Sequence, residues 1–114
     1  MKLPKLITIT KQKRRIYPIK LVINNRKLDE LILDPHYEKK HGNYLTDEII
    51  YNFALELNQK KVIIEDRKKP YDYFSHWPLF REWRAYKLIG CLEDDKNYLG
   101  IIDCYRRRKY DKKK

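Results

Sequence analysis

The sequence predicts an α+β fold: a small, mostly antiparallel β-sheet with one main amphipathic helix packed on a face, and a β-hairpin toward each end of the chain. Three observations predict it. Short apolar runs separated by turn residues occur in both halves, an amphipathic helical pattern lies between them, and 114 residues are enough for one domain with its own core. We therefore expect residues 1–114 to form a single domain, of which residues 109–114 are a flexible basic tail.

The first hairpin is predicted over two apolar-rich runs, Arg15–Ile23 and Lys27–Leu33. Asn24 and Asn25 stand between them, and because asparagine tolerates a positive φ they suit a tight turn. The next stretch, Asp34–Gly42, opens with an Asp-Pro turn signal. We expect it to contain one or two helical turns that end at its glycine.

The main helix is predicted over Thr46–Asn58. Thr46 is a suitable N-cap, and Asp47 and Glu48 lie in the first turn, where the helix dipole favours acidic side chains. The apolar residues recur with helical spacing along one face: Ile49, Ile50, Phe53, Ala54 and Leu57. This face is expected to pack against the sheet.

The middle of the chain is predicted to hold two further short strands. Lys61–Asp66 forms one, and Tyr71–Ser75, whose residues alternate in the manner of a strand, forms the other. Residues 76–82 are expected to be irregular, because Pro78 cannot donate a hydrogen bond to a neighbouring strand.

The C-terminal hairpin is predicted over Glu82–Glu93 and Tyr98–Arg107, joined by the polar turn 94–97. The second arm carries apolar residues at both odd and even positions, so both of its faces are expected to be covered. It should therefore lie in the centre of the sheet and end at a rim, where three arginines stand in succession.

The two cysteines lie on the two arms of this hairpin. Cys91 is expected to face Gly100 and Cys104 to face Lys87, so they are not cross-strand partners and are predicted to be buried thiols in a reducing compartment. The N-terminal apolar run is too short for a secretory signal, and no stretch is long enough for a membrane span. We expect a cytoplasmic protein with no membrane partner.

The net charge of +11 is concentrated at the two ends of the chain. Residues 1–20 carry seven Lys or Arg and no acid, residues 106–114 carry seven and one acid, and the body between them is nearly neutral. This distribution favours a polyanion partner, because Lys and Arg contacts to phosphates dominate nucleic-acid affinity. Charged ends that only keep a small domain soluble are the alternative.

The inventory of side chains favours chemistry on RNA without a metal. A Gly-rich phosphate loop, a Gly-x-Ser-x-Gly elbow and a His-Glu-x-x-His pair are all missing from the sequence, which instead has ten Tyr, two Trp and three His. Metal-independent RNA cleavage needs a base, a cation for the phosphorane and an acid, and aromatic rings stack unpaired bases. The acids of the turn 93–95 are expected to be solvated, and no metal or other cofactor is expected.

Three segments and the basic N-terminal stretch supply the candidate residues. "HYEKKHG" places a Lys-His pair beside a chain reversal, "REWRAY" places an arginine and a tyrosine on one face of a strand, and "CYRRRKY" ends the central strand. The candidate catalytic residues are Lys40, His41, Arg84, Tyr86, Arg106 and Arg107. The candidate nucleic-acid contacts are Arg14, Arg15, Tyr105, Arg108 and Lys109. The alternatives are an exposed histidine, and a packed Trp83 whose arginine neighbours are solvated.

The stretches "KKHGNYLTDEII" and "LGIIDCYRRRK" resemble the RelE/ParE-type toxins of bacterial toxin–antitoxin pairs, especially their BrnT-like branch. The resemblance covers about residues 34–109. It implies a small helix-on-sheet ribonuclease that is neutralised by an antitoxin protein. It also implies that the family's arginines correspond to Arg84 and to Arg106 or Arg107, and its Lys-His pair to Lys40 and His41.

Two classes of function follow. The first is a toxin-like, metal-independent endoribonuclease of a type II toxin–antitoxin system, with RNA and an antitoxin as partners. The second is a non-catalytic basic module that binds nucleic acid or a partner protein, such as a small phage or archaeal-virus regulator. The order of motifs and the arginines at the end of a central strand favour the first.

Overall fold

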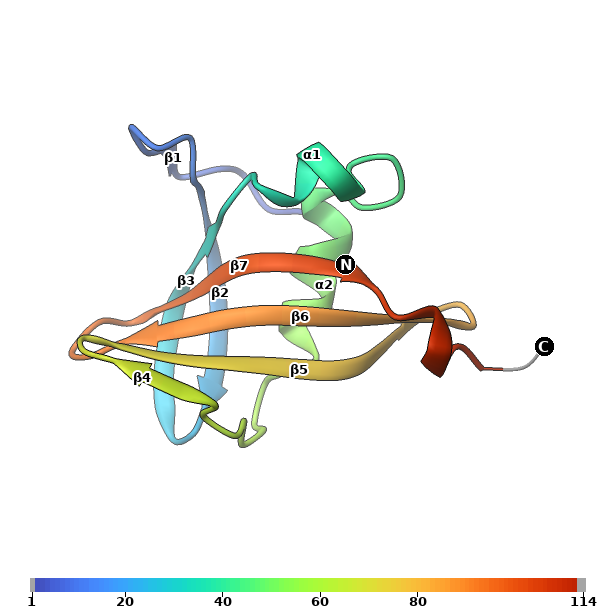
Figure 1. Ribbon diagram of the computed structural model, residues 1–114. Coiled ribbons are helices and arrows are strands. Elements are labelled where there is room, and N and C mark those ends of the chain that lie inside the picture. Colours follow the sequence, from blue (N-terminus) through green and yellow to red (C-terminus); the bar gives the residue numbers. More distant parts are fainter. Residues whose placement is uncertain (1, 113–114) are drawn as a thin grey trace.

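The computed structural model describes residues 2–112 and has the predicted α+β class: a seven-stranded, mostly antiparallel sheet with two short helices (Figure 1). The strands are β1 Thr8–Ile9, β2 Arg15–Ile23, β3 Arg26–Leu33, β4 Asp66–Lys68, β5 Tyr71–Arg81, β6 Arg84–Glu93 and β7 Tyr98–Arg106. The helices are α1 Tyr37–His41 and α2 Asp47–Leu55, and a short 3₁₀ helix, η1, covers Arg108–Tyr110.

The sheet has the order β1-β2-β3-β7-β6-β5-β4. Strand β7 is therefore central, as its apolar faces predict, and both predicted hairpins, β2–β3 and β6–β7, are present. Among the strands of the described chain, β3 and β7 form the parallel pair, and the other neighbours are antiparallel. Asn24 and Asn25 form the first turn with φ of 51° and 64°, the left-handed conformation expected of asparagine.

Both predicted helical segments form. The Thr46 hydroxyl accepts a hydrogen bond from the Ile49 amide at 3.2 Å, which caps α2. The helix is shorter than predicted, because after Leu55 the amides donate to carbonyls three residues earlier, as from Asn58 to Leu55 and from Lys60 to Leu57. Gln59, with φ of 66°, then turns the chain away.

The strand predicted over Lys61–Asp66 is wrong. Val62 is buried, but its amide donates to the Asn24 side-chain oxygen at 2.7 Å and its carbonyl accepts from the Asn24 amide group at 3.1 Å. One side chain thus satisfies the backbone groups that a neighbouring strand would otherwise bond. The strand begins only at Asp66.

Two further differences are shifts of register. Strand β5 continues through the stretch predicted to be irregular. Its pairing with β6 shifts between His76 and Leu79, where Pro78 has no amide hydrogen to donate. A second shift, in the β6–β7 pair, places Cys104 opposite Leu88 and not opposite Lys87, whereas Cys91 does face Gly100. Both thiols are free.

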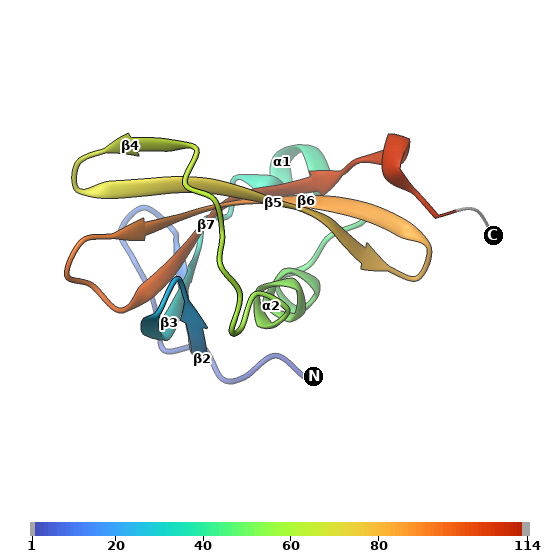
Figure 2. The same cartoon turned by 90° about the horizontal axis from the view of Figure 1, so that it is seen from below.

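The sheet has two different faces. Helix α2 packs on one face, which we call the helix face, and η1 lies toward the other, the open face (Figure 2). The helix face of β6 carries buried Tyr86, Leu88 and Leu92, and the Tyr86 ring lies 5.2 Å from that of Phe53 on α2. Because side chains alternate along a strand, the residues between them face the open side.

Candidate functional site

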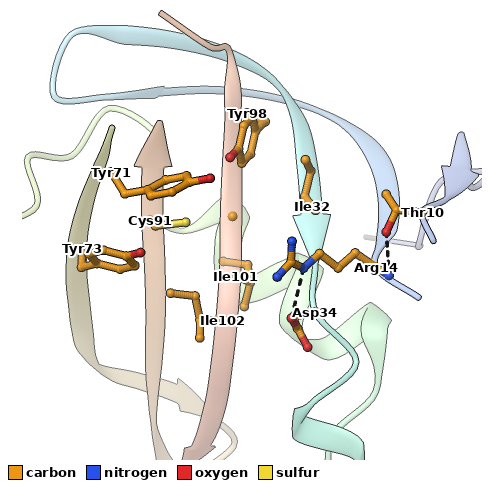
Figure 3. A pocket seen from close by; sticks show the side chains of 11 residues that line it. Thr10, Arg14, Ile32, Asp34, Tyr71, Tyr73, Cys91, Tyr98, Ile101 and Ile102 are labelled. Carbon is orange, nitrogen blue, oxygen red and sulfur yellow. Dashed lines mark hydrogen bonds and ion pairs between the residues drawn. The ribbon is translucent and has the colours of Figure 1, made fainter. Parts of the chain in front are cut away.

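The open face contains a hollow of about 440 Å³ over the centre of the sheet (Figure 3). Its floor is a row of paired residues across four strands, namely Tyr73, Cys91, Gly100 and Ile32. Gly100 keeps the floor low, because a Cβ there would come within 2.7 Å of the Cys91 sulfur. The hollow therefore exists because this strand position has no side chain.

Three tyrosines line the hollow. Tyr71 and Tyr73 project from β5 with ring centroids 5.9 Å apart, and Tyr98 stands across from them on β7 (Figure 3). The Tyr98 hydroxyl donates to a Glu93 carboxylate oxygen at 2.6 Å. Burial and this bond both raise the pKa of Tyr98, so the ring stays neutral and fixed in orientation.

A cation closes the opposite side of the hollow. Arg14, a predicted nucleic-acid contact, points toward it and forms an ion pair with Asp34 at 3.2 Å (Figure 3). Half of the Arg14 side chain is exposed, so its remaining donors face solvent at the edge of the hollow. Its amide donates to the Thr10 hydroxyl at 3.1 Å, which holds the backbone at this point.

The structure brings together His41 and Tyr105, two predicted site residues from distant parts of the chain. Their rings stack with centroids 5.9 Å apart. The hydroxyl of Tyr44 lies 2.5 Å from His41 Nδ1 and accepts a bond from the Arg106 amide at 3.4 Å. The Tyr44 hydroxyl can donate to His41 Nδ1 or accept from it, so this contact fixes the orientation of the ring and leaves Nε2 on the side away from Tyr44. Lys87 is paired with Tyr105 in the sheet and faces the same side.

Arg15, the neighbour of Arg14, belongs to a different environment. Its guanidinium pairs with Asp47 at 2.6 Å and with Glu38 at 3.2 Å. The hydroxyls of Tyr17 and Tyr37 also donate to Asp47, at 2.5 and 2.6 Å. Arg15 thus compensates a carboxylate at the start of α2, and its charge is directed into the protein and away from the open face.

Three of the predicted catalytic residues lie on the helix-face side of β6 and β7. Tyr86 is 2% exposed and packs against Phe53. Arg106 forms an ion pair with Asp111, and its guanidinium lies 6.0 Å from the Trp83 ring centroid. The Arg84 guanidinium also lies over the Trp83 ring, 5.2 Å from its centroid. These contacts give all three residues packing or positioning partners inside the fold.

The remaining predicted residues surround the end of β7. Arg107 lies 5.5 Å from the Tyr110 ring centroid, and Lys109 lies 5.7 Å from it. Arg108 and Lys40 are exposed. Within the predicted basic tail, residues 109–114, the Lys112 amide donates to the Trp83 carbonyl at 2.8 Å, and the flexibility of this segment stays a prediction. Residues 113–114 lie outside the described part.

The sequence reasoning missed the hollow. Tyr71, Tyr73 and Tyr98 were not among the candidate residues, although the alternation "YDY" places two tyrosines on one face. The other signal was Gly100, since a glycine inside an apolar strand often marks a close approach by a ligand or another chain. What the sequence could not show is that β5, β7 and the loop bearing Arg14 meet across the sheet.

Comparisons of the chain with models of protein families, with curated proteins and with solved structures find no match. The resemblance to RelE/ParE-type toxins therefore stays a prediction. Within residues 2–112, no three His, Cys, Asp or Glu side chains are grouped as metal ligands would be. The described helices are all too short or too polar to cross a membrane.

Proposed function

We propose that this protein binds an unpaired strand of RNA on the open face of its sheet. The observation that carries the proposal is the hollow in which Tyr71, Tyr73 and Tyr98 surround a glycine floor with Arg14 at the edge. Aromatic rings on an exposed sheet stack splayed bases, and each such stack contributes about 1–3 kcal/mol.

The charge distribution supports the same ligand. The carboxylates that line or adjoin the hollow are engaged, Asp34 by Arg14 and Glu93 by the Tyr98 hydroxyl. Meanwhile both ends of the chain are basic, and the C-terminal one lies beside the open face (Figure 2). An RNA strand bound here would stack its bases on the tyrosines of the hollow and place its phosphates near the basic ends of the chain.

Fluorescence anisotropy with a labelled oligouridylate tests the proposal. Tyr73→Ala should weaken binding about tenfold, because it removes one stacking surface, whereas Tyr73→Phe should bind like the native protein. Ile63→Ala is the matched control, since Ile63 is 83% exposed and does not line the hollow. Equal affinities for native protein, Tyr73→Ala and Ile63→Ala would contradict binding in the hollow.

The thiol at the floor gives an independent readout. Burial raises the pKa of Cys91 to about 11 and that of Cys104 to about 12, and Cys104 is fully buried. A thiol reagent at mildly alkaline pH should therefore modify Cys91 first. RNA in the hollow should slow this reaction several-fold, while an unchanged rate at saturating RNA would place the ligand elsewhere.

RNA cleavage is the second candidate, and the His41 group is the observation that favours it. Its Nδ1 is held by Tyr44, and its other ring nitrogen has no hydrogen-bond partner among the described residues, so it could exchange a proton with a bound strand. The test is cleavage of labelled RNA in the presence of a chelator, with His41→Ala expected to abolish cleavage and to preserve binding. Intact RNA after prolonged incubation would remove this candidate.

The toxin role and an antitoxin partner follow from this second candidate. Expression of the protein alone is expected to slow bacterial growth and to degrade translated messages. Normal growth at high soluble expression, with intact RNA, would leave RNA binding without toxicity.

A further inference from the structure

A second aromatic group lies at the other end of the open face. Trp77 sits where the pairing of β5 shifts, between the pairs His76–Leu88 and Leu79–Tyr86, and it is 42% exposed. The ring of Tyr110 in η1 lies 4.6 Å from the Trp77 ring, centroid to centroid, at 35°. Two rings from segments far apart in sequence thus form one platform next to Tyr105.

The chain holds Tyr110 in place from both sides. The Arg107 amide donates to the Ala85 carbonyl at 2.9 Å, and the Ala85 amide donates to an Asp111 carboxylate oxygen at 2.7 Å. The second carboxylate oxygen of Asp111 pairs with Arg106. Because the residues before and after Tyr110 are bonded to the sheet, the platform is preorganised and needs little ordering on binding.

This end of the face is strongly cationic. Arg107 and Lys109 lie within 6 Å of the Tyr110 ring centroid, and Lys112 lies 4.3 Å from that of Phe80. The one acid of this segment, Asp111, is engaged by Arg106 and by the Ala85 amide. Aromatic rings interleaved with unpaired cations are the composition that proteins use to hold bases and phosphates of a single strand.

We infer that Trp77 and Tyr110 form a second base-stacking subsite, and that one RNA strand occupies both this subsite and the hollow. Four residues of β6 separate Lys87 from Cys91, which at the rise of a strand is about 13 Å. A stacked nucleic-acid strand covers that distance in about four steps. The row between the two sites carries Ser75, Ile89 and Asp103 from neighbouring strands, and the Ser75 hydroxyl donates to a Glu65 carboxylate oxygen. A strand that joins the two sites would cross this row.

This inference rests on the proposed function, and binding of oligouridylates of two lengths tests the second subsite separately from RNA binding in the hollow. A dinucleotide reaches one site only, whereas a decanucleotide reaches both. We therefore expect Tyr73→Ala to weaken the binding of both oligouridylates, and Trp77→Ala to weaken the decanucleotide about tenfold while leaving the dinucleotide unchanged.

Two further variants distinguish stacking from a local change of fold. Trp77→Phe should restore most of the decanucleotide affinity, and Tyr110→Ala, on a different segment, should reproduce the loss seen with Trp77→Ala. Lys20→Ala is the matched control for surface charge, since Lys20 is exposed on β2.

The outcomes are distinct. If the dinucleotide binds and neither Trp77→Ala nor Tyr110→Ala changes the decanucleotide affinity, the second subsite is wrong and RNA binding in the hollow stands. If neither oligonucleotide binds the native protein, the proposed function itself fails. A Trp77→Ala protein that loses affinity equally for both lengths would also overturn the second subsite.

Discussion

Tyrosines on the two faces of this sheet have opposite roles. Tyr86 on the helix face is 2% exposed and packs among Phe53 and Tyr44, whereas Tyr73 on the open face is half-buried beside a hollow. The side chains are the same, and what differs is whether a helix covers them. A count of aromatic residues therefore says little about binding until the covered face is known.

The largest expected effect is a difference in the free energy of unfolding between alanine variants of these two tyrosines. Tyr86→Ala should lower the free energy of unfolding by about 3–5 kcal/mol, because it leaves a cavity in the core. Tyr73→Ala should lower it by less than about 1 kcal/mol, since its ring is only partly buried. Urea unfolding followed by circular dichroism measures both. Similar losses in the two variants would mean that the open face is also part of the core.

Alkaline pH should act through the two tyrosines that are bonded to Asp47. Burial, and then the bonds to Asp47, raise the pKa of Tyr17 and Tyr37 above the ordinary value of 10. Above pH 10 the unfolded chain loses these protons and the folded chain keeps them, so the stability that is present below pH 10 declines as the pH rises. These two tyrosines together should lower the free energy of unfolding by about 2–3 kcal/mol between pH 9 and pH 11, and Tyr98, Cys91 and Cys104, whose pKa values are also raised, should add to the decline.

The matched variants for this pH effect are Tyr17→Phe and Tyr105→Phe. The first removes one of the two hydroxyls on Asp47 and should remove about half of the decline that this pair of tyrosines causes. The second changes a tyrosine of the open face and should leave the slope as it is. An equal slope in all three proteins would show that other groups cause the alkaline loss.

A smaller effect is expected where the C-terminal segment joins the sheet. Asp111→Ala removes the partner of Arg106 and the acceptor of the Ala85 amide, and should lower the free energy of unfolding by about 1–3 kcal/mol. If the second subsite exists, this variant should also bind the decanucleotide more weakly, because Tyr110 loses its support. Arg108→Ala, on the exposed side of η1, is the control and should leave stability unchanged.

The smallest expected effect concerns the exposed cations. Arg108→Ala or Lys109→Ala should weaken RNA binding only a few-fold at low salt, and should reduce the slope of log affinity against log salt by about one. The hollow variants should instead change affinity at every salt concentration. Binding that is insensitive to salt in the native protein would mean that the basic ends serve solubility alone.

Much of the fold could be predicted because its signals are local. Alternation and turn residues predict the β2–β3 and β6–β7 hairpins, and Thr46 predicts the start of α2. The predicted elements that do not form lie where a residue distant in the sequence takes the hydrogen bonds that a local pattern would otherwise use. Val62 forms no strand because Asn24, 38 residues earlier, bonds both of its backbone groups.

The candidate site was predicted less well for the same reason. Three of the candidate residues lie on or beside the open face, namely Arg14, His41 and Tyr105. They could be selected from the sequence because they are basic or aromatic residues near the ends of predicted elements. Arginine, however, serves ion pairs inside the fold as readily as phosphates outside it. Only the structure shows that Arg15 and Arg106 are paired with Asp47 and Asp111.

The parallel pairing of β3 with β7 has a consequence for folding. The first three strands are neighbours in sequence, as are the last four, and residues 34–65 connect these two local units. The contacts between β3 and β7 therefore close a long loop and are expected to form late. The hollow lies across this seam, with Arg14 and Ile32 from one unit and Tyr73 and Tyr98 from the other. A ligand held there would link the two units, so its binding should slow hydrogen exchange most at the amides of the seam.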